Sequence, residues 1–301
     1  MSQLSVSWRR TAVVVALSAG LFASPLLGNI AGGELSALPV AAAKPSTAVA
    51  DAPRLGSVDN FRDVAGTGAG YDAQGSHHVN KGVFYRSNAL AANDADLATL
   101  NGLHLTAVYD LRTGGEIATK PDRVPAGASY TNISILSGDV SGGMGNLTSP
   151  AAAREAMRAL NRQFVTGAFE RARFAELLTQ LADQQGPAVF HCTAGKDRTG
   201  WTSYLLLSLA GVDQQTIMND YLLTNEYSAK SIAATLAQIT AAKGAAAAAI
   251  YQPLLGVEAS FLQAGVDQLV ADYGSVDKYL KDGLGLKGQT IEQLKHKLIQ
   301  K

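Results

Sequence analysis

The chain has 301 residues, of which 47% are hydrophobic and 17% are charged, so it is long and apolar enough to bury a sizeable core. Its 25 basic residues balance its 25 acidic residues. A net charge of zero excludes the overall basic field that is typical of nucleic-acid-binding proteins, and we expect no nucleic acid among its partners. The only cysteine, Cys192, excludes both an intrachain disulfide and a cysteine cluster for zinc.

The N-terminal segment has the composition of an export signal. Trp8-Arg9-Arg10 supplies a positive start, and an apolar stretch rich in Ala, Val and Leu follows from Thr11 to Leu27. Serine, glycine and proline interrupt that stretch, which makes it short for a membrane-spanning helix. We therefore predict a signal peptide over residues 1–43 and a flexible leader rich in Ala, Pro, Ser and Thr over 44–54. The mature protein is expected to be secreted and to have no stable membrane span.

Residues 55–301 are predicted to form one domain in which strands alternate with helices. The expected strands are Val83–Ser87, Thr106–Leu111, Tyr130–Leu136 and Pro187–His191, with a possible first strand or turn in Gly56–Gly66. The expected helices cover Ala95–Leu100, a helical insertion at about 137–185, Thr199–Ala210, Asp213–Leu223, Asn225–Lys243, Val257–Tyr273, Ser275–Asp282 and Thr290–Gln300. This alternation predicts an α/β fold with a mainly parallel central sheet flanked by helices.

Ligands of such sheets bind at the carboxyl ends of the strands. Arg86, Asp110 and Cys192 each lie at the end of a predicted strand. We therefore expect the functional site at this edge of the sheet.

The stretch from Val189 to Trp201 is a strand, a loop and the start of a helix. A helix N-terminus with unpaired backbone N–H groups favours an anion. Five residues separate Cys192 from Arg198, enough to turn the thiol and the guanidinium toward one bound group. A thiolate is a nucleophile, and a guanidinium matches two phosphoryl oxygens. The alternatives, a buried structural cysteine and a surface arginine, fit this spacing less well.

The residues between them have supporting roles in this interpretation. The backbone of the loop, Thr193, Ala194, Gly195, Lys196 and Asp197, would form the anion cradle together with Arg198 and Thr199. Gly195 would permit a backbone conformation that a side chain would obstruct. The Thr199 hydroxyl would lie near the sulfur or cap the helix, and His191 would orient the loop.

His-Cys-x-x-x-x-x-Arg-Thr/Ser resembles the signature loop of cysteine-dependent phosphatases. The variant HCTAGKDRTGW is most similar to secreted bacterial tyrosine phosphatases of the mycobacterial type, and the segments NFRD, YRS and YDLR also match that family. The resemblance implies a cysteine-phosphatase-like fold for residues 55–301 and a protein tyrosine phosphatase that acts through a cysteinyl-phosphate. It implies no metal and no organic cofactor, and phosphotyrosine proteins as substrates.

A general acid must protonate the leaving group. The chain lacks the Trp-Pro-Asp loop of the eukaryotic enzymes, and the resemblance implicates Asp110 of Tyr109-Asp110-Leu111-Arg112. Asp197, just before Arg198, is the second candidate for the general acid, and Asp139 is the third. Position at a strand end favours Asp110.

Two further functions stay open in the sequence. The first is a phosphoinositide or broad dual-specificity phosphatase, since Lys196, if it is not simply a solvated lysine, would bind a second phosphate. A catalytically silent phosphate-binding module is the alternative from another class, although it would not need the thiol. Six motif residues either touch substrate or hold the loop: Asn60, Arg62, Asp63, Arg86, Ser87 and Arg112. The helices in 137–185 are expected either to pack on the sheet or to form a lid over the site.

Overall fold

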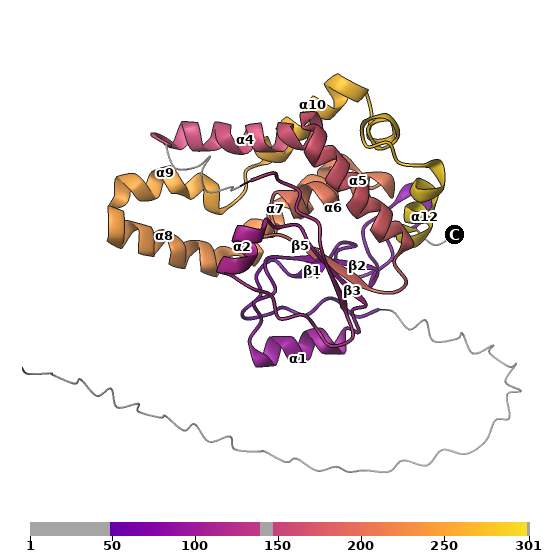
Figure 1. Ribbon diagram of the computed structural model, residues 1–301, viewed down its shortest axis with the longest axis horizontal. Coiled ribbons are helices and arrows are strands. Elements are labelled where there is room, and N and C mark those ends of the chain that lie inside the picture. The colour runs from indigo at the N-terminus through magenta and orange to yellow at the C-terminus, as the bar shows by residue number, and fades with distance from the viewer. Residues whose placement is uncertain (1–48, 139–146, 300–301) are drawn as a thin grey trace, which may run out of the picture. The chain divides into compact units, whose positions relative to one another are not determined.

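A five-stranded sheet lies at the centre of residues 49–138 and 147–299, the part of the chain that the computed structural model describes (Figure 1). The predicted signal peptide, the first part of the predicted leader and Asp139 lie outside these residues. The strands are β1 (Arg62–Asp63), β2 (Phe84–Ser87), β3 (Ala107–Asp110), β4 (Ser129–Asn132) and β5 (Ala188–His191). Their order is β1-β2-β5-β3-β4, and only β1 is antiparallel to its neighbour. The predicted mainly parallel sheet is confirmed.

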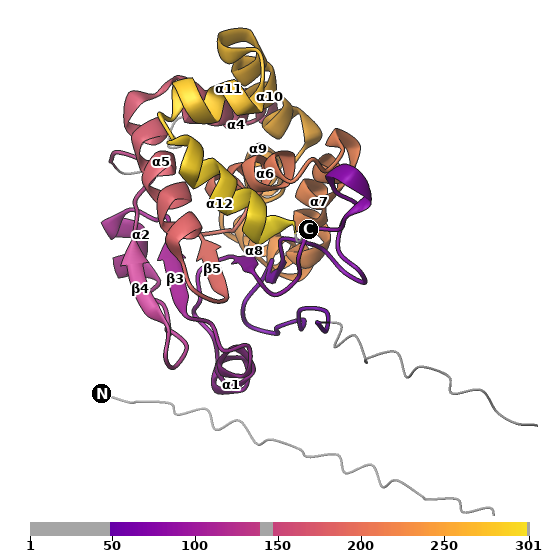
Figure 2. The ribbon, with the colours of Figure 1, turned by 90° about the vertical axis from the view of Figure 1, so that its right-hand side faces the viewer.

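The two faces of the sheet carry layers of different depth. Phe84, Tyr109 and Phe190 point into a large core that is shared with helices. These helices are α4 (Pro150–Thr166), α5 (Ala168–Asp183), α6 (Arg198–Leu209), α10 (Ala259–Tyr273) and α12 (Gly288–Leu298). Tyr85 and Val189, one residue along on the same strands, point to the opposite face and a smaller cluster beside α1 (Asp94–Gly102). Figure 2 shows α5, α6 and α12 on one side of the strands and α1 on the other.

Local sequence explains where several helices begin. The side chains of Asn93, Ser149 and Asp213 accept hydrogen bonds from backbone N–H groups in the first turns of α1, α4 and α7 (Gln214–Tyr227). Thr113 and Glu116 form a reciprocal capping box that starts α2 (Gly114–Thr119). The helices predicted from the sequence did not include this one.

The region from 150 to 185 contains two helices, α4 and α5, that pack on the rest of the domain. Gly167 has an extended backbone conformation, which separates α4 from α5. A Cβ at this position would lie 2.9 Å from the Gln163 carbonyl oxygen and closer still to the Glu170 carboxylate, so the close packing here suits glycine. Phe174, Leu177 and Leu181 of α5 are completely buried. This helix is therefore part of the main core, and a lid movement of the segment stays a prediction.

Two helices extend away from this core. α8 (Ala229–Lys243) and α9 (Ala245–Leu255) lie side by side as a hairpin (Figure 1). The alanine run at 245–249 begins α9, as alanine's high helix propensity favours, and the helices predicted from the sequence did not include α9. After α10 come the short α11 (Val276–Lys278) and a π-helical turn at Tyr279–Gly283.

No single helix within residues 49–138 and 147–299 is both long and apolar enough to cross a membrane. α9 and α10 meet the length and composition criteria only when taken together, and they are bent by 46° at the break between them.

Candidate active site

The carboxyl ends of the parallel strands form one row across the sheet. Ser87 of β2 and Asp110 of β3 are both paired with His191 of β5, and Asp110 is paired with Asn132 of β4. Cys192 follows this row directly and is 2% exposed. The register therefore brings the predicted strand-end residues to one edge, as the sequence analysis expected.

The loop after Cys192 depends on a glycine. Gly195 has φ of +67°, and a Cβ there would lie 2.3 Å from the carbonyl oxygen of Ser87. Both observations require glycine, since L-residues rarely adopt this conformation and the space is filled. The loop backbone thus passes directly against the end of β2.

Side chains from the NFRD and YRS segments hold the other side of Gly195. Its carbonyl oxygen accepts hydrogen bonds from Asn60 Nδ2 at 2.7 Å and Arg86 Nη2 at 3.0 Å. Arg86 and Arg62 both pair with Asp220 of α7, at 2.9 and 3.0 Å. Burial and the neighbouring Arg62 lower the pKa of Arg86 to about 10, although Asp220 and Cys192 oppose this shift. These side chains support the loop.

The remaining motif residues also have local partners. The Asp63 carboxylate accepts hydrogen bonds from the backbone N–H groups of Ala65 and Gly82, and burial raises its pKa to about 6. Ser87 Oγ donates to the carbonyl oxygen of Asn88. Both residues stabilise turns, which is the structural alternative considered for them.

Arg198, the first residue of α6, is held by Glu116 of α2. Nη1 and Nη2 lie 2.7 and 2.6 Å from the two carboxylate oxygens, in the forked geometry that guanidinium groups favour. Glu116 also accepts a hydrogen bond from Thr193 Oγ1. Burial alone would raise the pKa of Glu116, but its hydrogen bonds and ion pair with Arg198 outweigh burial and lower it to about 2.

The sequence analysis missed Glu116 entirely. The signal that could have found it is the pattern Thr-x-x-Glu at 113–116, which predicts a helix start. That start lies at the carboxyl edge of the sheet and carries the glutamate to Arg198.

Lys196 does not extend into solvent. It is 5% exposed, and its Nζ donates to the carbonyl oxygens of Leu254 and Gly256 at 2.7 and 3.0 Å, where α9 ends. Cations at a helix C-terminus are favourable, so this lysine ties the loop to the α8–α9 hairpin. The contact differs from both alternatives, a solvated lysine and a free second phosphate site.

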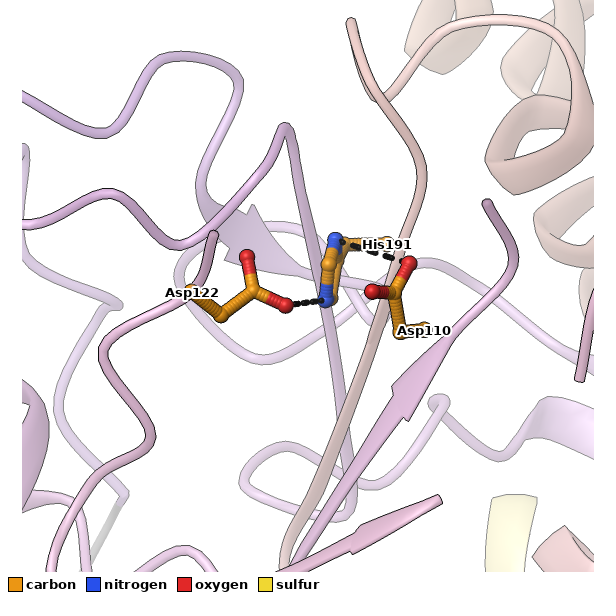
Figure 3. Close-up of side chains that lie close together, drawn as sticks. All are labelled: Asp110, Asp122 and His191. Atoms are coloured by element: carbon orange, nitrogen blue, oxygen red, sulfur yellow. Dashed lines mark ion pairs between the residues drawn. The ribbon is translucent and has the colours of Figure 1, made fainter. Parts of the chain in front are cut away.

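The two candidate acids occupy different environments. Asp110 is completely buried, and Arg112 Nε and Nη2 donate to its two carboxylate oxygens, each at 2.8 Å. Burial raises its pKa, but Arg112, His191 and a hydrogen bond from Tyr130 together lower the pKa below its ordinary value. The side chain therefore stands in a closed charge network (Figure 3).

Asp197 immediately precedes Arg198 and is 13% exposed. Its Oδ2 lies 3.7 Å from Lys196 Nζ, and its Oδ1 has no hydrogen-bond partner among the described residues. Asp197 is the N-cap residue of α6, but its side chain makes no capping bond. Its carboxylate thus makes fewer interactions than that of Asp110.

Thr199 lies inside α6, so the capping role considered for it is wrong. Its buried hydroxyl has no hydrogen-bond partner in the described part of the chain. A buried hydroxyl without a partner at this position is available to the neighbouring loop.

Comparisons with known proteins identify the family of this chain. A model of the tyrosine phosphatase family matches residues 53–300. A Cupriavidus necator protein, whose name provisionally calls it a tyrosine-protein phosphatase, is 34% identical over 76% of this chain and 82% of its own length. The triple specificity protein phosphatase PtpB of Mycobacterium tuberculosis is 29% identical over 80% of this chain and 96% of its own length. A tyrosine-protein phosphatase of Nostoc commune is 35% identical over 44% of this chain and 45% of its own length.

The matched range includes the sheet, the loop from Cys192 to Arg198 and the helices that carry their partners, Glu116 and Asp220. Cysteine dependence is typical of this family, and the single cysteine of the chain lies in that loop. This chain belongs to the tyrosine phosphatase family and is a phosphatase enzyme of the PtpB-like bacterial type.

Proposed function

We propose that this enzyme hydrolyses phosphotyrosine in proteins through a covalent cysteinyl-phosphate. The observation that carries the proposal is the loop itself: the only thiol of the chain directly follows β5, and Arg198, held by Glu116, begins α6 six residues later. A nucleophile and a two-pronged cation on one tight loop suit a phosphoryl group.

The reaction has two steps in this mechanism. The Cys192 thiolate attacks phosphorus, the bond between phosphorus and the tyrosine oxygen breaks, and that oxygen takes a proton from a general acid. Water then attacks phosphorus and gives a proton to the carboxylate that the first step left behind, and the S–P bond breaks, which releases inorganic phosphate and regenerates both the thiolate and the acid. Arg198 and the loop N–H groups stabilise the charge on the phosphoryl oxygens in both steps.

We infer that Asp197 is the general acid. The Asp197 side chain is 13% exposed, and its buried Oδ1 has no hydrogen-bond partner among the described residues, whereas both oxygens of Asp110 are engaged by Arg112. An acid must also be protonated before it can donate, and the lowered pKa of Asp110 opposes this.

The experiment compares Asp197→Asn with Asp110→Asn on aryl phosphates that differ in leaving-group pKa. Asp197→Asn should reduce turnover of phenyl phosphate by about 10²–10⁴-fold and affect para-nitrophenyl phosphate much less. A uniform loss on both substrates in Asp110→Asn would indicate a structural role for that residue. If only Asp110→Asn shows the leaving-group dependence, the assignment is wrong.

The covalent step and the substrate class need separate measurements. Cys192→Ser should abolish turnover, and mass spectrometry after rapid acid quench should show a phosphate adduct on the wild-type protein alone. Phosphotyrosine peptides and monophosphoinositides are then assayed side by side. Because Lys196 is held by two carbonyl oxygens, we expect the peptide to be the better substrate. Phosphate binding without turnover on any substrate would favour the silent binding module.

Secretion remains part of the proposal and rests on the N-terminal composition of residues 8–27. Expression of the full chain in a bacterial host, followed by detection of a shortened protein outside the cytoplasm, tests it. Retention of the full-length chain in the cytoplasm would contradict it.

A further inference from the structure

Two groups of buried polar side chains lie beside the loop from Cys192 to Arg198. In the first, Asp110 and Asp122 flank His191, as Figure 3 shows, and the three side chains have the composition of a metal site. Nη2 of Arg112 lies 2.8 Å from a carboxylate oxygen of each aspartate, so a guanidinium already occupies the position between the carboxylates. The second group lies at the first turn of α6.

Tyr221 of α7 packs against this first turn. The residue is 1% exposed, and a Cβ built on Gly200 would lie 3.0 and 3.1 Å from two carbon atoms of its ring. The ring therefore lies directly against the backbone of Gly200, where the absence of a side chain lets it approach the helix this closely. Gly200 follows Asp197 by three residues, which is close to one helical turn.

The hydroxyl of Tyr221 is buried but has no hydrogen-bond partner among residues 49–138 and 147–299. Buried tyrosine hydroxyls usually find a partner, as that of Tyr279 does when it donates to the carbonyl oxygen of Phe164 at 2.9 Å. A buried hydroxyl without a partner costs free energy that a neighbouring acceptor would recover.

Asp197 offers such an acceptor. Its Oδ1 is buried and has no hydrogen-bond partner in the described part of the chain, while its Oδ2 lies 3.7 Å from Lys196 Nζ. Burial raises the pKa of the Tyr221 phenol well above its ordinary value, and the negative charge of Asp197 raises it further, although Arg86 opposes this shift. The phenol thus keeps its proton and lies within electrostatic reach of a carboxylate oxygen that has no donor.

We propose that Tyr221 is a positioning residue for the general acid: its hydroxyl donates to Oδ1 of Asp197, directly or through one water molecule, and thereby turns Oδ2 toward the leaving-group oxygen. A carboxyl group rotates easily about its last torsion, so a donor fixed on one oxygen sets the direction of the other. An acid must lie within hydrogen-bond reach of the atom that it protonates. Tyr221 acts through Asp197 and does not touch substrate. The inference rests on the proposed roles of Cys192 and Asp197.

The first test compares Tyr221→Phe with the wild type on phenyl phosphate and para-nitrophenyl phosphate. Loss of the hydroxyl should lower kcat about ten-fold for phenyl phosphate and less than about two-fold for para-nitrophenyl phosphate, since the poorer leaving group depends more on its proton. In an Asp197→Asn background the same substitution should change neither rate, because no acid is left to position. An equal loss on both substrates in Tyr221→Phe would overturn the proposal.

Tyr279→Phe is the matched control. It also removes the hydroxyl of a buried tyrosine, but one that donates to the backbone carbonyl of Phe164 and not to a side chain of the loop. This variant should be less stable than the wild type and should keep the wild-type ratio of the two rates. A change of that ratio as large as the change in Tyr221→Phe would contradict the assignment, because the effect would then not depend on Asp197.

The second test does not depend on turnover. Urea denaturation gives the equilibrium constants for unfolding of the wild type, Tyr221→Phe, Asp197→Ala and the double variant. If the hydroxyl and the carboxylate interact, the unfolding constant of the double variant should be at least about three-fold smaller than the two single effects multiplied together. Effects that simply multiply would mean that the two side chains do not interact, and the proposal would fail.

The two tests separate this inference from the proposed function. If Asp197→Asn shows no leaving-group dependence, the assignment of the acid fails and the positioning role fails with it, whereas coupled unfolding constants would still establish the contact. If Asp197→Asn shows the dependence and Tyr221→Phe does not, the inference about Tyr221 fails alone.

Discussion

The loop from Cys192 to Arg198 has two sides that hold their charges differently. On the outer side, Glu116 projects from a six-residue helix, and its ion pair with Arg198 is partly accessible to solvent. On the inner side, Asp220 pairs with Arg62 and Arg86 in contacts from which solvent is almost excluded.

This difference gives the two sides different roles: the outer ion pair contributes to phosphate binding, and the inner ion pairs support the loop. The outer pair can rearrange when a phosphoryl group arrives, because water and neighbouring hydroxyls can satisfy the released carboxylate. The inner pairs cannot open without leaving a buried charge, so they fix the loop backbone instead. Substitutions on the two sides should therefore affect different measurements.

The largest expected effect is on the outer side. Arg198→Lys replaces the forked guanidinium with a single ammonium, and turnover of para-nitrophenyl phosphate should fall at least about 1,000-fold. The thermal midpoint should change little. Arg158→Lys, in a surface pair with Glu155, serves as the control. A loss of less than ten-fold would mean that bidentate binding is not required.

Substitutions on the inner side should lower the stability of the protein. Asp220→Asn leaves Arg62 and Arg86 without a counter-charge and should lower the free energy of unfolding by about 3–5 kcal/mol, measured by urea denaturation. Asp213→Asn is the matched control, since Asp213 is the exposed N-cap of the same helix and asparagine caps equally well. Equal stability of the two variants would contradict the assigned support role.

Gly195 lies where the two sides meet. Gly195→Ala introduces a Cβ against the Ser87 carbonyl at a positive φ, and we expect a loss of about 2–4 kcal/mol of stability together with most of the activity. Gly102→Ala, at the end of α1 with open space around it, should be neutral or slightly stabilising. Full activity of Gly195→Ala would show that the loop has another stable conformation.

Glu116→Gln should have the smallest effect, a loss of stability that depends on pH. The pKa of Glu116 is about 2 in the folded protein and 4.5 ordinarily, so its ion pair stabilises the fold fully above pH 4.5 and is lost as the pH falls toward 2. After allowance for solvent screening, the free energy of unfolding of the wild type should exceed that of the variant by about 1–2 kcal/mol at pH 7. Thermal unfolding at pH 3 and pH 7 measures this, and a difference that grows on acidification has the wrong sign.

Much of this architecture could be predicted from short segments. The apolar strands that end at Ser87, Asp110 and His191 were found because β-favouring residues run directly into polar ones. The boundary between α7 and α8 was placed too early, and α2 was missed. Both errors arise where a helix is short or follows another helix without a clear break in hydrophobic period.

The site was harder to predict than the fold. Asp110 was preferred as the acid because it ends a strand, but a strand end says nothing about the partners that its side chain finds. Arg112, two residues later, engages both of its carboxylate oxygens. Lys196 similarly found two carbonyl oxygens almost 60 residues away, at the end of α9.

The sequence by itself determined the loop that carries the proposed nucleophile. Cys192, Gly195 and Arg198 lie within seven residues, and their chemistry is local: a thiol, a turn that requires glycine, and a cation at a helix start. Tertiary structure alone decided which carboxylates serve the loop. Glu116, Asp122 and Asp220 come from three distant segments, and the sequence does not say which arginine or histidine each will meet. Ion pairs of this kind form only after the sheet register and the helix packing have fixed the distances between their charges.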